Sequence, residues 1–140
     1  MKEEMSREIN IAKNWITFKD ELMMENPRLG TADLITYLED KTDMKDAPAS
    51  TKFHLNVEGG LTEHSLNVLD FIREAQAILQ VPNIAPQSMT IVALPHDLCK
   101  TNYYEMGKEW DKEYKNLTNK WREKDVWKVK DSLPLGHGEK

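Results

Sequence analysis

The sequence has one cysteine, Cys99, so this chain of 140 residues cannot form an internal disulfide. A single cysteine also fits a reducing compartment. No apolar run approaches the roughly 18 residues that a membrane-spanning helix needs. The first ten residues, MKEEMSREIN, lack the apolar core of a signal peptide. We therefore expect a cytoplasmic protein without a membrane segment.

An excess of basic residues is also missing. Lys and Arg number 19 against 24 Asp and Glu, which gives a formal net charge of −5. This balance argues against a protein that binds nucleic acid over its whole surface, although it leaves room for a local basic patch. A composition of 39% apolar and 31% charged residues is typical of a polar globular protein. At this length we expect a single domain over residues 1–140.

Much of the chain shows the three- and four-residue apolar spacing of amphipathic helices. This spacing predicts helices over about residues 9–23, 31–38 and 61–79, and the nearly apolar segment 89–94 predicts a buried helix. Further along, charges alternate with aromatic residues, and the segment VWKVK alternates with period two. This pattern predicts a short β-hairpin between about residues 108 and 130. The expected fold class is therefore all-α in the main.

The chain has only four histidines, which are His54, His64, His96 and His137. His64 shares a helix face with Val68 and Ile72, so it should point toward the interior. His96 follows the most apolar helix and stands beside Asp97. Buried imidazoles and a carboxylate are costly to desolvate, and a divalent metal ion compensates because these groups are its usual ligands. The competing interpretation is an ordinary hydrogen-bonded core histidine.

A proline stands directly before the His-Asp doublet. Adjacent side chains on a helix point about 100° apart, so His96 and Asp97 can reach one site only near a helix end or a distortion. Pro95 can kink the helix just before the doublet, or it can simply mark the residue at which the helix ends. Both interpretations stay open on the sequence alone.

Three segments in a particular order resemble a known family. They are FHLNVEGGLTEHS, ALPHDLCK and SLPLGHGEK, which occupy residues 53–65, 93–100 and 132–140. Together they resemble the HD-domain superfamily of metal-dependent phosphohydrolases, and in particular a prokaryotic and phage-type subgroup. The resemblance implies a helical HD-domain bundle, with residues 1–45 as an N-terminal helical region and 50–140 as the HD core.

The resemblance also implies a metal site. By position, His64, His96 and Asp97 match the metal ligands of the family, and His137 matches an additional histidine that binds a second metal or phosphate. The implied cofactor is one or two divalent ions of Mn, Fe, Mg, Zn, Ni or Co. For His137, a place in a glycine-flanked tail remains the alternative.

Three further residues match family positions near the substrate. Lys100 matches a lysine near the substrate phosphate, so Asp97 and Lys100 are the expected catalytic residues. His54 and Glu63 are expected to contact substrate or to support the metal ligands. The alternatives are that Lys100 only complements a helix dipole and that His54 is an ordinary loop residue.

The implied activity is hydrolysis of a nucleotide or nucleic-acid phosphoester by metal-activated water. Expected partners are a phosphorylated small molecule or nucleotide, or RNA or DNA ends, and the oligomeric state is open. No aspartate follows His137, where the family has its last ligand, so we expect the C-terminal family helices to be missing. A catalytically inactive HD-fold module that binds a ligand or a protein is therefore the first alternative. A plain helical nucleic-acid binder is the second. Separately, the aromatic segment 108–130 could stack on a nucleotide or single strand, or it could be an exposed hairpin with ordinary aromatic packing.

Overall fold

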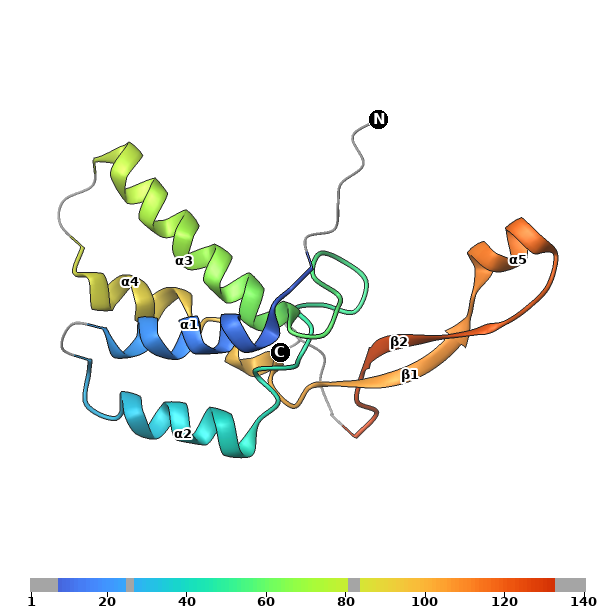
Figure 1. Ribbon diagram of the computed structural model, residues 1–140, viewed down its shortest axis with the longest axis horizontal. Helices are drawn as coiled ribbons and strands as arrows, with labels where there is room; N and C mark the ends of the chain where they lie inside the picture. Colours follow the sequence, from blue (N-terminus) through green and yellow to red (C-terminus); the bar gives the residue numbers. More distant parts are fainter. Residues whose placement is uncertain (1–7, 25–26, 81–83, 133–140) are drawn as a thin grey trace.

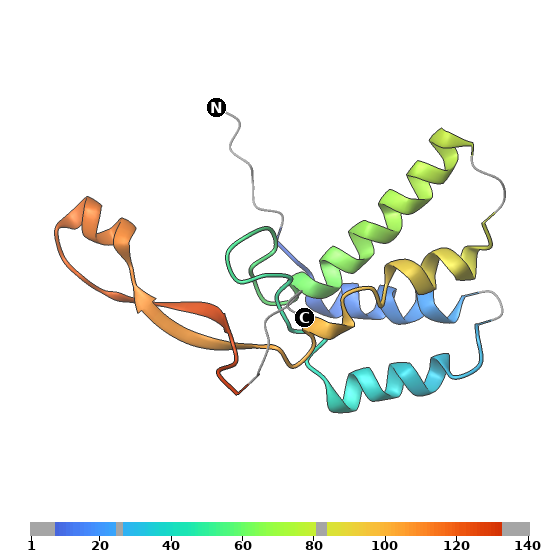
Figure 2. The same cartoon turned by 180° about the vertical axis from the view of Figure 1, so that it is seen from behind.

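The computed structural model describes residues 8–24, 27–80 and 84–132 (Figure 1). Its helical body contains α1 (Ile11–Met23), α2 (Thr31–Lys41), α3 (Gly60–Leu79) and α4 (Pro86–Ala93). A short 3-10 turn, η1 (Leu98–Lys100), leads into an arm built from β1 (Tyr104–Trp110), α5 (Lys112–Thr118) and β2 (Glu123–Val129). The arm extends away from the helices in both views (Figures 1 and 2). The expectation of a mainly helical chain with a small antiparallel hairpin is confirmed.

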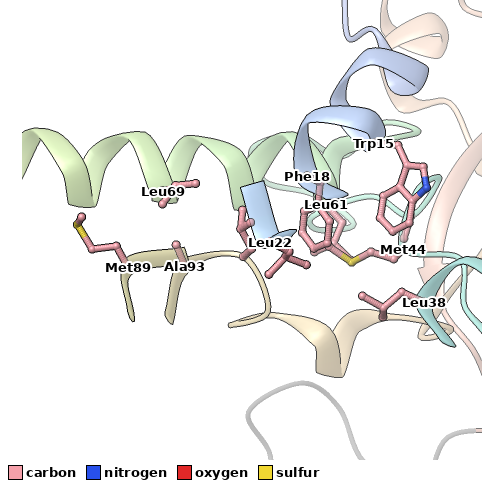
Figure 3. Packing of buried hydrophobic residues seen from close by; sticks show 11 residues of the cluster. Trp15, Phe18, Leu22, Leu38, Met44, Leu61, Leu69, Met89 and Ala93 are labelled. Carbon is pink, nitrogen blue, oxygen red and sulfur yellow. The ribbon is translucent and has the colours of Figure 1, made fainter. Parts of the chain in front are cut away.

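The helices meet around one apolar core. α1 begins where the side chain of Asn10 accepts a hydrogen bond from the N–H of Lys13 at 3.0 Å, which satisfies a free donor at the helix start. Core side chains come from α1, α2, α3, α4 and the loop after α2, as Figure 3 shows. Phe18 and Leu61 are fully buried there, and each large apolar side chain contributes about 1.5–3 kcal/mol. None of the helices in the described ranges is both long and apolar enough to cross a membrane.

The paired glycines define the start of α3. Gly59 has φ +78°, a conformation that glycine adopts without the steric cost of a Cβ. A Cβ on Gly60 would lie 2.1 Å from the carbonyl oxygen of Leu55. The next N–H, that of Leu61, donates to the carbonyl of Ala47 at 2.9 Å. These contacts place the first turn of α3 tightly against the segment that precedes it.

The arm is joined to the end of α2 by one asparagine. Asn102 has φ +56°; its N–H donates to Asp43 Oδ1 at 2.6 Å, and its Nδ2 donates to the carbonyl of Lys41 at 3.0 Å. The strands then pair from Tyr104 with Val129 to Trp110 with Glu123. Asn102 Oδ1 also accepts the N–H of Asp43 at 3.1 Å. The three hydrogen bonds of Asn102 anchor the base of the arm.

The hairpin differs in detail from the prediction. Its first strand begins at Tyr104 and not near residue 108, and α5 replaces a simple turn between the strands. Asp111 explains the helix, because its Oδ1 accepts the N–H of Tyr114 at 2.9 Å and caps the first turn. Asn119 ends α5 in the left-handed conformation, with φ +59°. The segment 112–118 has the caps of a helix at both ends, a signal that the period-two interpretation overlooked.

Candidate metal centre

His96 and Asp97 lie in the turn that follows α4. The helix ends at Ala93, and Leu94 makes the last helical bond to Thr90. Pro95 is outside the helix, and its carbonyl accepts the N–H of Leu98 at 3.2 Å. Of the two interpretations of Pro95, the structure therefore supports a helix end and not a kink. In a turn, neighbouring side chains are free of the helical 100° spacing and can reach the same site.

His64 comes from the first turns of α3 and meets this doublet. Its Nε2 lies 3.3 Å from Asp97 Oδ2 and 3.2 Å from His96 Nε2. The third distance, from His96 Nε2 to Asp97 Oδ2, is 3.2 Å. The three atoms form a group of a size that could hold a metal ion, with all of them within 4.8 Å of one another. The structure thus brings together three of the four predicted metal ligands, but His64 is only partly buried and His96 is exposed, so the expectation of two buried imidazoles is wrong.

The protonation of His96 suits a metal ligand. Its Nδ1 lies 2.6 Å from the carbonyl oxygen of Ala93, and a carbonyl oxygen only accepts, so this hydrogen bond assigns the ring proton to Nδ1. In neutral His96 the lone pair is then on Nε2, which faces His64 and Asp97. A backbone carbonyl in this role is the usual outer partner of a metal-binding histidine. Two imidazole nitrogens and a carboxylate oxygen form a donor set that suits divalent transition metals.

The local electrostatics of His64 and Asp97 favour the forms that bind a cation. Burial lowers the pKa of His64 below its ordinary value, and the negative charge of Asp97 only partly offsets this. Burial pushes the pKa of Asp97 upward, but the hydrogen bond and charge of Lys100, aided by the two imidazoles, bring it below its usual value. Near neutral pH the site therefore offers a neutral His64 and an ionised Asp97, which are the forms that bind a cation.

Lys100 is engaged with the protein itself. Its Nζ lies 3.2 Å from Asp97 Oδ2 and donates to the carbonyl of Ala49 at 3.0 Å, and its side chain is only 12% exposed. These contacts tie the turn after α4 to the segment before α3. An ammonium group has three donors, and its contacts within the described residues use two of them. A contact between Lys100 and a substrate phosphate stays a prediction.

The other predicted site residues are placed differently. His54 lies next to the cluster, with its Nε2 3.3 Å from His64 Nδ1. Glu63 faces α1, where its carboxylate accepts from the side chain of Asn14. Both line a pocket of about 1030 Å³ together with Phe53. His137 lies outside the described residues.

Sequence reasoning missed two groups that hold the site. The carbonyl oxygens of Ala49 and Ala93 bind Lys100 and His96 respectively. Alanine side chains carry no signal for this role, because the contact depends only on where the backbone runs.

Comparisons with family models, with curated proteins and with solved structures find no match to this chain. The case for a function consequently rests on the arrangement of His64, His96 and Asp97 and on the order of the sequence motifs.

Proposed function

We propose that this protein is a metal-dependent phosphohydrolase of the HD type, in which His64, His96 and Asp97 hold a divalent cation. The observation that carries the proposal is the convergence of two imidazole nitrogens and a carboxylate oxygen within 4.8 Å of one another. The hydrogen bond from His96 Nδ1 to Ala93 supports it, because this bond directs the other ring nitrogen into the cluster. The order of the three sequence motifs supports the family assignment.

The proposed reaction is hydrolysis of a phosphoester by water. A bound divalent cation would lower the pKa of a water molecule and offset negative charge on the phosphoryl oxygens. Lys100 fixes the position of the Asp97 carboxylate, because its Nζ lies 3.2 Å from Asp97 Oδ2. A third N–H of the ammonium group is the proposed donor to a substrate oxygen. Lys100 is thus the expected contact of the phosphate.

A nucleotide or a nucleic-acid end is the proposed substrate. The pocket of about 1030 Å³ is lined by His54, which contacts His64, so it adjoins the cluster. Phe53 lines the same pocket and is 80% exposed. Exposed aromatic rings beside a phosphate site can stack on a nucleobase.

One observation favours a second candidate, a catalytically inactive HD-fold module that binds a ligand or a protein. Asp97 already has a full positive charge beside it in Lys100, at 3.2 Å. This pair offsets the cost of burying the carboxylate without a metal ion. In the inactive module the cluster would be a polar network that stabilises the turn after α4.

Metal content and hydrolysis together test the proposal. The full chain, purified without chelator and then supplied with Mn²⁺, is expected to hold metal and to hydrolyse bis-p-nitrophenyl phosphate or a nucleotide. His64→Ala should lose both properties, because it removes one of three ligand atoms. Asn67→Ala, an exposed position on the same helix, serves as the matched control and should retain them.

Three results decide between the candidates. If neither protein holds metal and His64→Ala also leaves thermal stability unchanged, the metal centre is wrong. Metal binding without hydrolysis of any phosphoester favours the inactive module. Hydrolysis that is lost with EDTA and in His64→Ala supports the phosphohydrolase.

A further inference from the structure

His64 lies between two other imidazoles. Its Nε2 faces the cluster, 3.2 Å from His96 Nε2 and 3.3 Å from Asp97 Oδ2. Its Nδ1, at another corner of the ring, lies 3.3 Å from His54 Nε2. The ring centroids of His54 and His64 are 5.0 Å apart. Whatever occupies one nitrogen of His64 therefore constrains the other.

The ring of neutral His64 carries one N–H proton, which can be on Nε2 or on Nδ1. On Nε2 it would be donated to Asp97 or His96, and Nδ1 would then accept from His54. On Nδ1 it would be donated to His54 Nε2, and the Nε2 lone pair would face the cluster. His96 cannot supply a proton to this exchange in its neutral form, because its Nδ1 proton is bonded to Ala93. Only the second arrangement leaves both imidazoles with lone pairs toward Asp97.

We propose that His54 is a positioning residue for the metal centre. Its Nε2 accepts the Nδ1–H of His64, and this hydrogen bond directs the Nε2 lone pair of His64 toward the ion. This inference rests on the proposed metal centre. Outer hydrogen-bond partners of this kind fix both the tautomer and the ring orientation of a metal ligand, and their loss typically weakens metal binding 10–100-fold.

Hydrogen bonds within the loop fix the backbone at His54. The hydroxyl of Ser50 donates to the carbonyl of His54 at 3.1 Å and accepts the N–H of Phe53 at 3.0 Å. The N–H of Ala49 donates to the carbonyl of Leu55 at 3.0 Å, which closes the loop at its base. The side chain of His54 is exposed, so a substitution there removes the contact with His64 and leaves the core intact.

Two substitutions of His54 separate the effect of its hydrogen bond from the effect of its side-chain volume. In His54→Gln the side-chain amide oxygen can still accept the proton of His64 Nδ1, whereas in His54→Leu nothing can accept it. Co²⁺ and Zn²⁺ affinities of the full chain are measured by competition with a chelating indicator. His54→Leu should weaken both affinities about 10–100-fold, and His54→Gln should recover most of the loss. Lys52→Arg, at an exposed position on the same loop, should match the wild type.

A spectroscopic measurement tests the tautomer directly. In the Zn²⁺-loaded protein, imidazole ¹⁵N spectra should show the proton of His64 on Nδ1, with Nε2 bound to metal. The inference is overturned if His54→Leu binds Co²⁺ as tightly as the wild type, if His54→Gln is as weak as His54→Leu, or if the His64 proton is on Nε2. If the wild type does not bind metal, both the proposed function and this inference are overturned. If the wild type binds metal tightly and His54→Leu binds it equally tightly, only the inference about His54 is overturned.

Discussion

Gly60 carries the strictest steric requirement that we find at a single residue of the site. It lies at the first residue of α3, four positions before His64, and its backbone packs directly against the carbonyl of Leu55. Because the obstructing atom belongs to the backbone, it cannot rotate away as a side chain would. The close approach joins the α3 start, which positions His64, to the loop that carries His54.

Substituting Gly60 should therefore lower stability and disturb the cluster of His64, His96 and Asp97. In Gly60→Ala the new Cβ would meet the Leu55 oxygen at 2.1 Å, and we expect the free energy of unfolding to fall by about 1–3 kcal/mol, as for other overpacked sites. Urea unfolding followed by tryptophan fluorescence measures the loss. Gly107→Ala is the control, since the three atoms nearest to its new Cβ belong to the flexible side chain of Lys128. Equal stability of Gly60→Ala and the wild type would contradict the close packing.

At the scale of elements, the arm depends on the turn that joins it to α2. Asn102 combines two properties that are rarely needed together, a left-handed backbone and a side chain that bonds in both directions. Asparagine tolerates this conformation better than most residues because its short polar side chain can bond locally. The arm itself has a further cap in Asp111, whose Oδ2 also pairs with Arg122 at 3.0 Å.

Two substitutions of Asn102 separate its backbone and side-chain roles. Asn102→Gly keeps the left-handed φ but loses the side-chain bonds, and each bond contributes about 0.5–1.5 kcal/mol. Asn102→Ala loses the bonds and also pays about 1–2 kcal/mol for the left-handed backbone. We therefore expect stability in the order wild type, then Gly, then Ala, in urea unfolding. Amide hydrogen exchange in β1 should accelerate in the same order; an alanine variant as stable as the glycine variant would argue against the backbone role.

At the scale of the whole molecule, the site joins elements that are far apart in the sequence. His64 lies on α3, the doublet follows α4, and Lys100 reaches back to Ala49 before α3. α3 and α4 pack on each other and on α1, so the core sets the spacing of the cluster. Any change in protonation at His64 is consequently coupled to global folding.

This coupling predicts how stability depends on pH without metal. The folded pKa of His64 lies below its ordinary value because of burial, whereas the unfolded chain binds this proton near pH ~6.5. As pH falls through and below that value, the unfolded state takes up more protons than the folded state, so the free energy of unfolding falls. Urea unfolding in EDTA, measured from neutral to mildly acidic pH, should show this decrease. His64→Gln should flatten it, and an unchanged slope would contradict the burial effect.

Asp97 acts in a different pH range. Its pKa lies below the usual carboxyl value, so its stabilising contribution is complete above pH ~3.8 and is lost only as pH falls through the folded pKa. The two effects can therefore be measured separately on one pH series.

Local pattern was enough to predict several elements. The apolar spacing predicted helices near those observed, because a helix with one buried face must repeat its apolar residues every three or four positions. The period-two segment predicted the hairpin, although α5 was missed because its seven residues carry no apolar face in the core. His64, His96 and Asp97 stood out because they lie within or directly after apolar segments, whereas their grouping as ligands of one ion was implied by the resemblance of the motifs and not by local spacing.

The sequence by itself determined the helical character of the chain and its hairpin, since these depend on side-chain type and on short-range spacing, and the resemblance of its motifs singled out His64, His96 and Asp97. Only the tertiary structure decided that Pro95 ends a helix, that Lys100 is held by Asp97 and Ala49, and that His54 lies against His64. Such contacts join residues up to 51 positions apart. They depend on the path of the backbone and on carbonyl groups that every residue carries, and residue identity does not encode either.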